Sequence, residues 1–207
     1  MNFAKTGSRQ MKYLVIVAHP VEDSLAKRSA YAVEEELSKA GHAVELLDLY
    51  KHGFDPVLSE AGLRAFRTQE HRPSIRALHD QLRSAQGLVL CYPTWWHGPP
   101  AILKGYLEQM FVPGVGYEVA NGKLRPLLTG LTRIDVLTSY NSPWWLVRLF
   151  NLSADRSALV RGVKLACAPR AVVRWHAMYR MARRDRTTVL EYVQKIRASF
   201  RGGNAVG

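Results

Sequence analysis

Residues 87–111 form the stretch that most restricts how this chain can fold. An apolar run at 87–92 leads into a loop of aromatic and small residues at 93–98, and a helical pattern begins near Pro100. A strand that passes through a short loop into a helix is typical of an open α/β sheet, in which ligands bind beyond the carboxyl ends of the strands. Two tryptophans, a histidine and a glycine favour a flat aromatic ligand, held by stacking and by close backbone approach. The alternative is a surface turn whose tryptophans cover the end of the sheet.

Other apolar runs alternate with helical patterns along the chain. Because these runs are continuous, they indicate parallel strands that are buried on both faces. Neither G-x-G-x-x-G nor G-x-x-x-x-G-K-[ST] follows the first run, which argues against a dinucleotide-binding Rossmann fold and against a P-loop. We therefore predict an α/β fold, namely a flavodoxin-like, doubly wound, five-stranded parallel sheet with strand order 2-1-3-4-5. The predicted strands lie at residues 12–18, 43–49, 87–92, 131–138 and 170–177.

Capping residues mark several of the connecting helices. Asp23 or Ser24 is expected to begin the first helix, and Asp185 to begin the last. Residues 51–73 are predicted to be irregular with one helical turn. Residues 141–155 are rich in aromatics, and their pattern predicts no element.

The length of 207 residues suits one domain. We expect a leader at residues 1–11, a single domain at 12–200 and a tail at 201–207. No apolar segment reaches the ~18 residues that a membrane span needs. The first apolar run is too short for a secretory signal peptide and is not followed by a cleavage site, so a cytoplasmic protein is expected.

Several chemistries receive no support from the sequence. Cys91 and Cys167 occur in apolar contexts and form no C-x-x-C pair, so buried thiols are expected and no disulfide is implied. The seven histidines show no H-x-x-x-H or H-E-x-x-H spacing, so no metal site is predicted. No Ser-His-Asp order and no pair of carboxylates at helical spacing supports hydrolysis.

Positive charge is concentrated in the last third of the chain. Residues 1–132 hold 15 Lys and Arg against 13 Asp and Glu, whereas residues 133–207 hold 14 against 4. Such a segment is compatible with binding to nucleic acid or an anionic membrane, with a solvated helical face, or with attraction of phosphate-bearing cofactors. The basic residues are dispersed among apolar ones, which favours the last two interpretations, and no nucleic-acid partner is predicted.

Three loops are predicted to meet at one edge of the sheet, because they follow the first, third and fourth strands. After the first strand, His19 and Ser24 precede a helix whose N-terminal N–H groups suit a phosphate, although Ser24 is also compatible with a plain helix cap. The aromatic loop follows the third strand. After the fourth strand, Thr138 and Ser139 either donate to a planar heterocycle or form an ordinary turn. The agreement of three neighbouring loops carries more weight than any one of them.

These residues resemble a known family. His19-Pro20 followed by Asp23-Ser24, and then Pro93-x-x-Trp96-x-Gly98-x-Pro100-Ala101-Ile102-Leu103-Lys104-Gly105, are similar to the flavodoxin-fold NAD(P)H:quinone oxidoreductases, the DT-diaphorase group and its bacterial relatives. The resemblance extends from Lys12 to about Phe200, and the second motif is the specific one. It implies a homodimer with a non-covalent flavin at the subunit interface. It also implies a two-step hydride relay from NAD(P)H to an acceptor, often a quinone.

The resemblance assigns expected roles residue by residue. The phosphate loop corresponds to His19, Ser24 and Leu25, and the loop along the isoalloxazine edge to Pro93, Thr94, Trp95, Trp96 and His97. The third flavin loop corresponds to Thr138, Ser139 and Tyr140. Glu108 matches an acidic position that lies near the adenosine in the FAD-binding members. Tyr117 matches an aromatic that lines the partner subunit's acceptor pocket.

Three positions depart from the pattern of the family. Ala26 or Lys27 replaces the usual asparagine after the phosphate-loop serine, and residues 138–141 read Thr-Ser-Tyr-Asn where the family has Thr-Thr-Gly-Gly. Residues 143–145, Pro-Trp-Trp, replace the Tyr and His that assist hydride transfer in the best-known members. The fold and the flavin are expected to survive these changes, whereas the acceptor and the handling of protons do not carry over.

The expected activity is a two-electron reduction of a quinone or similar flat acceptor by a ping-pong relay, with NAD(P)H as co-substrate. Trp96, Tyr140 and Tyr117 are expected to line the flavin and acceptor space. FAD is expected in preference to FMN, because Glu108 is retained and Arg197 is placed to reach an adenosine diphosphate, although the missing asparagine argues the other way. The alternative is a flavin-binding regulatory subunit that docks on a membrane transport protein through the basic last third.

Overall fold

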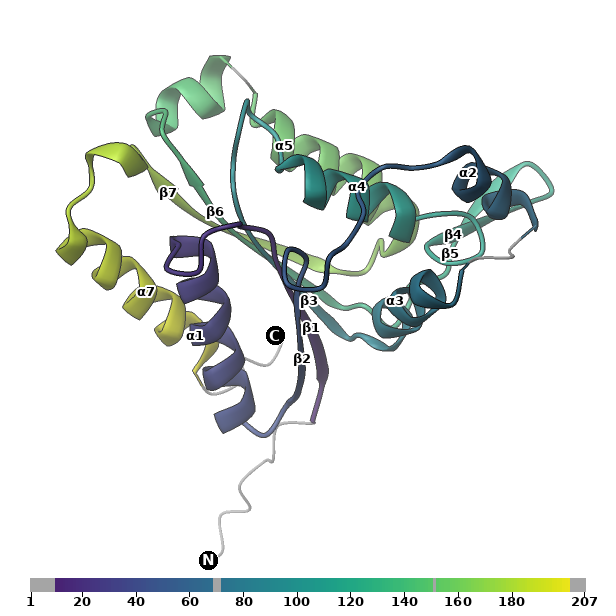
Figure 1. Ribbon diagram of the computed structural model, residues 1–207, viewed down its shortest axis with the longest axis horizontal. Helices are drawn as coiled ribbons and strands as arrows, with labels where there is room; N and C mark the ends of the chain where they lie inside the picture. The colour runs from purple at the N-terminus through teal and green to yellow at the C-terminus, as the bar shows by residue number, and fades with distance from the viewer. Residues whose placement is uncertain (1–9, 69–71, 151, 202–207) are drawn as a thin grey trace, which may run out of the picture.

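The main element of the computed structural model, which describes residues 10–68, 72–150 and 152–201, is a parallel sheet. Its five strands have the order β2-β1-β3-β6-β7, and each neighbouring pair is parallel (Figure 1). In chain order these are the first to fifth strands of the sheet, so the predicted order 2-1-3-4-5 is confirmed. The strands are β1 (Lys12–Val17), β2 (Ala43–Asp48), β3 (Gly87–Pro93), β6 (Arg133–Tyr140) and β7 (Val172–Tyr179).

Helices cover both faces of the sheet, as Figure 1 shows. On one face, α1 and α7 pack against alternate strand residues such as Tyr13 and Val15. On the other face, α3, α4 and the helical segment 154–167 pack against Leu14 and Leu88. Because side chains of a strand alternate between faces, the continuous apolar runs supply both layers of the core. The helices are α1 (Leu25–Lys39), α2 (Glu60–Thr68), α3 (Pro73–Ser84), α4 (Ala101–Met110), α5 (Ala154–Ser157), α6 (Leu165–Cys167) and α7 (Arg186–Phe200).

Two predicted helix caps are present. The side chain of Ser24 accepts a hydrogen bond from the N–H of Lys27 at the start of α1, and Asp185 accepts one from the N–H of Thr188 at the start of α7. Pro100 is the N-cap of α4 and so lies just before the helix. The side chains of Ser24 and Asp185 satisfy backbone N–H groups that the first turn of a helix leaves without partners.

Some elements differ from the sequence-based expectation. The helix α2 spans nine residues, where one helical turn was expected within residues 51–73. Residues 146–150 form one π-helical turn, and residues 158–164 join α5 to α6 through π-helical geometry. An antiparallel hairpin of β4 (Tyr117–Ala120) and β5 (Lys123–Pro126) was not predicted. Its turn is Asn121-Gly122, both with positive φ, and this pair is a strong hairpin signal that the short exposed strands did not reinforce.

Several expectations concern the ends of the chain and the membrane. Residues 1–9 of the predicted leader and 202–207 of the predicted tail lie outside the described residues. Within the described part of the chain, no helix has the length and apolar character that would let it cross a bilayer.

Both cysteines are buried with free thiols, and burial raises the pKa of Cys167 to about 11.

Gly105, the last residue of the 93–105 sequence motif, allows a close approach between α4 and the chain after β2. A Cβ at Gly105 would lie 2.3 Å from the carbonyl oxygen of Pro56 and 2.6 Å from its Cα, which is backbone that cannot swing aside. We predict that Gly105→Ala lowers the free energy of unfolding by about 1–3 kcal/mol, although alanine favours a helix by ~1 kcal/mol, because overpacking outweighs helix propensity. Urea denaturation measures the change.

The matched control is Gly162→Ala, which also lies in a helical segment. No described atom comes within 4 Å of the Cβ it would add, so this variant is expected to be as stable as the wild type or more so. Equal stability of Gly105→Ala and the wild type would show that the close packing of α4 is not required.

Candidate functional site

The three predicted loops meet in one cavity beyond the carboxyl ends of β1, β3 and β6. The cavity has a volume of about 350 Å³, which is within the range of small-molecule sites. Seven of the predicted cofactor residues line it, together with residues that the sequence did not suggest. The lining residues are His19, Val21, Asp23, Ser24, Leu25, Ala26, Pro93, Thr94, Trp95, Ser139, Asn141 and Met181.

The first loop offers hydrogen-bond donors to this cavity. The N–H of Val21 donates to His19 Nδ1 over 3.0 Å, and burial lowers the pKa of His19, so its ring is neutral with the proton on Nε2. At the start of α1, the N–H groups of Leu25 and Ala26 donate no hydrogen bond within the described residues. Two backbone donors and an imidazole N–H thus face the cavity at the positive end of a helix dipole.

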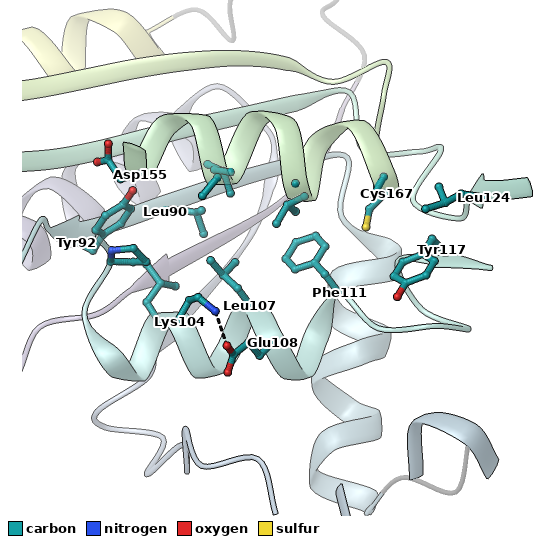
Figure 2. A pocket seen from close by; sticks show the side chains of 17 residues that line it. Leu90, Tyr92, Lys104, Leu107, Glu108, Phe111, Tyr117, Leu124, Asp155 and Cys167 are labelled. Atoms are coloured by element: carbon teal, nitrogen blue, oxygen red, sulfur yellow. Dashed lines mark hydrogen bonds and ion pairs between the residues drawn. The ribbon is translucent and has the colours of Figure 1, made fainter. Parts of the chain in front are cut away.

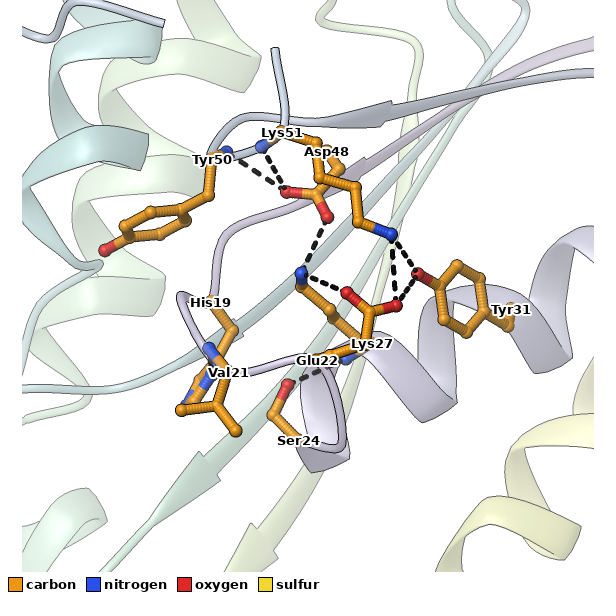
Figure 3. A network of polar contacts seen from close by, with 9 residues as sticks. All are labelled: His19, Val21, Glu22, Ser24, Lys27, Tyr31, Asp48, Tyr50 and Lys51. Carbon is orange, nitrogen blue, oxygen red and sulfur yellow. Dashed lines mark hydrogen bonds and ion pairs between the residues drawn. The ribbon is translucent and has the colours of Figure 1, made fainter. Parts of the chain in front are cut away.

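A network of charged side chains holds the first loop against β2 (Figure 3). The ammonium group of Lys27 is buried and lies 2.9 Å from a carboxylate oxygen of Glu22 and 2.9 Å from one of Asp48. Although burial alone would lower the pKa of Lys27, the hydrogen bonds to Asp48 and Glu22 raise it. Glu22 also accepts from Tyr31 and Lys51. Lys27 thus fixes the first loop through Glu22 and Asp48.

Asp23 lines the cavity without leaving its charge uncompensated. Its two carboxylate oxygens accept from Nε and Nη2 of Arg28, each over 2.6 Å. This bidentate pair neutralises the acid at the rim of the cavity. A phosphate at the start of α1 therefore does not meet an isolated negative charge.

The aromatic loop is a tight turn with two left-handed residues. The backbones of Trp95 and Gly98 are joined by two hydrogen bonds of 3.0 Å, and Trp96 and His97 between them have φ values of 50° and 58°. Positive φ at both central residues is the signature of a type I′ turn, which glycine and asparagine normally occupy. The ring of Trp96 is fully exposed, with a relative accessibility of 101%. Backbone strain combined with an exposed tryptophan is typical of a site where a ligand or partner binds.

The third loop is tied to the aromatic loop through an aspartate far along the chain. The N–H of Thr94 donates to the carbonyl of Ser139 over 2.9 Å, and the hydroxyls of Thr94 and Thr138 lie 2.7 Å apart. Asp155, which is buried in α5, accepts from the hydroxyls of Thr94 and Tyr140. Asp155 therefore joins two of the three loops.

Tyr140 is a predicted catalytic residue whose ring is buried away from the cavity. It stacks on Tyr179 at a centroid distance of 5.2 Å, and its hydroxyl is held by Asp155. Burial, together with the neighbouring carboxylate, raises the pKa of Tyr140 well above its ordinary value. Its hydroxyl is thus a poor source of protons, and its contribution to a ligand site is structural.

Glu108 and Tyr117 lie in a second cavity, which is separate from the three loops (Figure 2). This cavity has a volume of about 520 Å³ and lies between α4, the helical segment 154–167 and the hairpin. Glu108 forms an ion pair with Lys104 on the same helix. Tyr92 and Asp155 lie at one end of the cavity, whereas Tyr117 and Cys167 lie at the other. One chain therefore does not bring Tyr117 to the three-loop cavity.

The structure pairs Arg197 with α1 and adds two residues to the lining of the three-loop cavity. Arg197 does not extend toward a ligand, because its guanidinium lies 2.6 Å from Glu35 and 3.0 Å from Glu36 on α1. Asn141 and Met181 line the three-loop cavity, and the side chain of Asn141 accepts from the N–H of Ala182. The sequence analysis missed Asp155. Its one signal there is that it is the only acid among residues 136–184, and its partners could not be inferred because they lie far away in the sequence.

Comparison with known proteins identifies the family of the chain. A family model described as the flavodoxin-like fold matches residues 11–145, well over half of the sequence. An uncharacterized NAD(P)H oxidoreductase of Haemophilus influenzae is 36% identical over 119 residues, which cover 57% of this chain and 59% of the relative. NAD(P)H dehydrogenase (quinone) 1 of Cavia porcellus is 29% identical over 124 residues, covering 52% of this chain and 45% of the relative. The chain thus spans about half the length of the curated relatives it matches.

Solved structures share the fold over nearly the whole chain. A protein of Streptococcus mutans superposes with a TM-score of 0.80 at 26% identity, covering 92% of this chain and 99% of that one. An FMN-dependent NADH-azoreductase of Bacillus anthracis, solved in complex with FMN, superposes with a TM-score of 0.74 at 16% identity, covering 91% of this chain and 97% of that one. These likenesses show a common fold.

The network around the first loop makes stability depend on pH. Hydrogen bonds from Lys27, and further ones from Tyr31 and Lys51, lower the pKa of Glu22 from 4.5 to about 2. A carboxylate with a lowered pKa stabilises the fold fully above the unfolded value and loses its contribution as the pH falls through the folded one. We predict that Glu22→Gln lowers the melting temperature at pH 7, and that this difference disappears between about pH 4.5 and about pH 2.

The control is Glu191→Gln on α7, since Glu191 is exposed and forms no ion pair within the described residues. Its melting temperature is expected to stay close to the wild-type value across the same pH range. A difference between Glu22→Gln and the wild type that persists unchanged at pH 2 would contradict the role of the ionised Glu22.

Proposed function

Because the chain belongs to the flavodoxin-like fold family, we propose that it is a flavin-dependent NAD(P)H oxidoreductase that reduces a quinone or similar flat acceptor by two electrons. The observation that carries the proposal is the meeting of three loops around one cavity, with donors for an anion at one loop and an aromatic turn at the next. The names of the curated relatives support it.

The residues present suit the two ends of a flavin. The N–H groups of Leu25 and Ala26 and Nε2–H of His19 would hold the phosphate, because they are the cavity's donors at a helix N-terminus. The Thr94 and Trp95 positions would hold the ring system together with Ser139, whose carbonyl accepts from the N–H of Thr94. The buried Lys27 stays with its two carboxylates and keeps this loop in place.

We propose FMN as the flavin. Both residues that favoured FAD are engaged elsewhere, since Glu108 lies in the second cavity and Arg197 is paired with α1. The FMN complex of the azoreductase with the same fold supports this choice. A cavity of about 350 Å³ is also modest for a dinucleotide.

The bound flavin would supply the hydride relay between NAD(P)H and the acceptor. The chain's own side chains bind and orient. The exposed ring of Trp96 offers a flat apolar face, and the closed turn fixes the backbone that carries it. Asp155 holds Thr94 and Tyr140, so it positions the two loops that would border the ring system.

A homodimer is part of the proposal. Tyr117, which is expected to line the acceptor pocket, does not reach the three-loop cavity of its own chain. A second copy related by a two-fold axis is able to supply it from the other side, as symmetric contacts exchange the same residues. The split of the expected residues between two cavities therefore supports a site shared by two chains.

The first prediction concerns the cofactor. The purified protein is expected to be yellow, and mass spectrometry of the released cofactor to show FMN. Leu25→Pro removes one N–H at the first helical position, which proline tolerates, and Ser24 before it already has extended backbone. Because the lost bond is charge-assisted, FMN affinity is expected to fall about tenfold or more.

Leu25→Ala is the matched control, because it removes the side chain and keeps the N–H. Equal FMN affinity of the two variants would remove this N–H from the phosphate site. Release of FAD would overturn the choice of FMN, and a protein that binds neither flavin would overturn the function.

The second prediction concerns the activity. Steady-state turnover of NADPH with soluble quinones is expected to give parallel double-reciprocal lines. Trp96→Asn suits the left-handed position better than tryptophan and loses no packing, so the fold is retained. It is expected to raise the KM for the acceptor about three- to tenfold by removing an aromatic face. Intersecting lines would contradict the relay, and an unchanged KM would remove Trp96 from the acceptor site.

A further inference from the structure

The segment after β6 exposes large apolar side chains to solvent. The relative accessibilities are 55% for Trp144, 41% for Trp145, 65% for Leu149, 72% for Phe150 and 76% for Leu152. In Figure 1 this short helical turn stands beyond the carboxyl ends of the strands, away from the core. Several exposed large apolar side chains in one short segment mark a site of interaction.

The fold keeps these side chains outward. Val147, at 2% accessibility, is the residue of the turn that packs inward. The rings of Trp145 and Phe150 meet edge to face, with their centroids 6.0 Å apart. Neither Trp144 nor Trp145 lines the three-loop cavity or the second cavity. The segment therefore presents an apolar surface that the described part of the chain leaves uncovered.

Cationic side chains are frequent in the part of the chain that contains this segment. Residues 141–186 contain ten Lys and Arg against two acids, of which Asp155 is buried and Asp185 caps α7. Arg148 lies within the turn and Arg156 just after it, both exposed. The 180–183 turn adjoins the same segment, because the N–H of Arg180 donates to the carbonyl of Ser142 over 3.3 Å.

These arginines are available to a partner. Among the described residues, no ion pair engages the side chain of Arg148, Arg156, Arg180 or Arg183. We define the docking surface as these four arginines together with the five exposed apolar residues. It joins aromatic and aliphatic side chains to unpaired positive charge.

We propose that the docking surface binds an anionic lipid bilayer. Tryptophan and phenylalanine favour the boundary between headgroups and acyl chains, the leucines enter the acyl layer, and the arginines meet lipid phosphates. A second copy of the chain fits less well, because a two-fold contact through this surface would bring the arginines of one copy against those of the other.

Docking on a bilayer would also determine where the electron acceptor comes from, a consequence that rests on the proposed function. Asn141 and Met181 line the three-loop cavity, and the side chain of Asn141 accepts from the N–H of Ala182, so the two lie together beside the docking surface. A bilayer bound here would lie next to the mouth of that cavity. The acceptor class that this arrangement favours is a lipid-soluble quinone held in the membrane.

Vesicle co-sedimentation tests the proposal. The full-length protein is expected to sediment with vesicles of equal parts phosphatidylglycerol and phosphatidylcholine at low salt, and much less with phosphatidylcholine alone. Leu149→Ser/Phe150→Ser is expected to weaken binding at least tenfold, and Arg148→Gln/Arg156→Gln roughly twenty-five-fold, at about fivefold per charge. At about 1 M salt the charge contribution is screened, so the arginine variant and the wild type are expected to converge.

Lys39→Gln/Lys123→Gln is the matched control, because it removes the same charge from exposed positions elsewhere. Failure of the wild type to sediment with phosphatidylglycerol vesicles would overturn the proposal, as would an equal loss of binding in this control. Light scattering of Leu149→Ser/Phe150→Ser adds a further test. If these changes dissociate an oligomer and leave vesicle binding intact, the surface joins two copies and the proposal fails.

Turnover of NADPH with a water-soluble quinone in the absence of vesicles separates this proposal from the proposed function. Its loss in the wild type would remove the enzymatic activity while leaving the docking measurement valid. Conversely, turnover without vesicle binding would retain the oxidoreductase and remove the docking surface.

Discussion

Burial of the central strands on both faces is the constraint on which the rest of the structure depends. β3 is buried along its whole length and is hydrogen-bonded to β1 and β6, while helices pack against both sides. Parallel neighbours require a crossover helix between them, so the loops that leave β1, β3 and β6 all emerge at one edge. The candidate site is therefore a consequence of how the core is covered, and its loops are anchored by the most buried part of the molecule.

The same burial encloses a charged pair. Arg133 and Asp135 are at most 1% accessible and lie two residues apart on β6, so their side chains share a face of the sheet. His176 on β7 lies 3.1 Å from Asp135, and the Arg133 guanidinium lies 4.9 Å from the ring of Phe200 on α7. Removing two charges from water is costly, and here each charge compensates the other. The pair therefore connects β6 with β7 and α7. Because the third loop lies at the carboxyl end of β6, these contacts also hold the strand that carries that loop.

The features that the sequence predicted are local ones, and those that it missed depend on contacts between distant residues. Ser24 caps the helix that it precedes, and the loops after three strands meet because strand order follows from the alternating pattern. Lys27 shows the limit, since its effect depends on Asp48 at the end of a different strand. Tyr140 shows it again, because its ring is buried against Tyr179 on β7 and its hydroxyl is held by Asp155, both far from it in the sequence.

The sequence by itself determined the alternation of strands and helices, the order of the sheet and the three loops at its edge, because apolar periodicity and helix caps act over a few residues. Tertiary structure decided which side chains face the cavity. Asp155 reaches Thr94 from 61 positions away, and the left-handed geometry of Trp96 and His97 is imposed by a closed turn that neither residue type favours. Such contacts leave no periodic trace in the chain, because they depend on how distant elements pack once both faces of the sheet are covered.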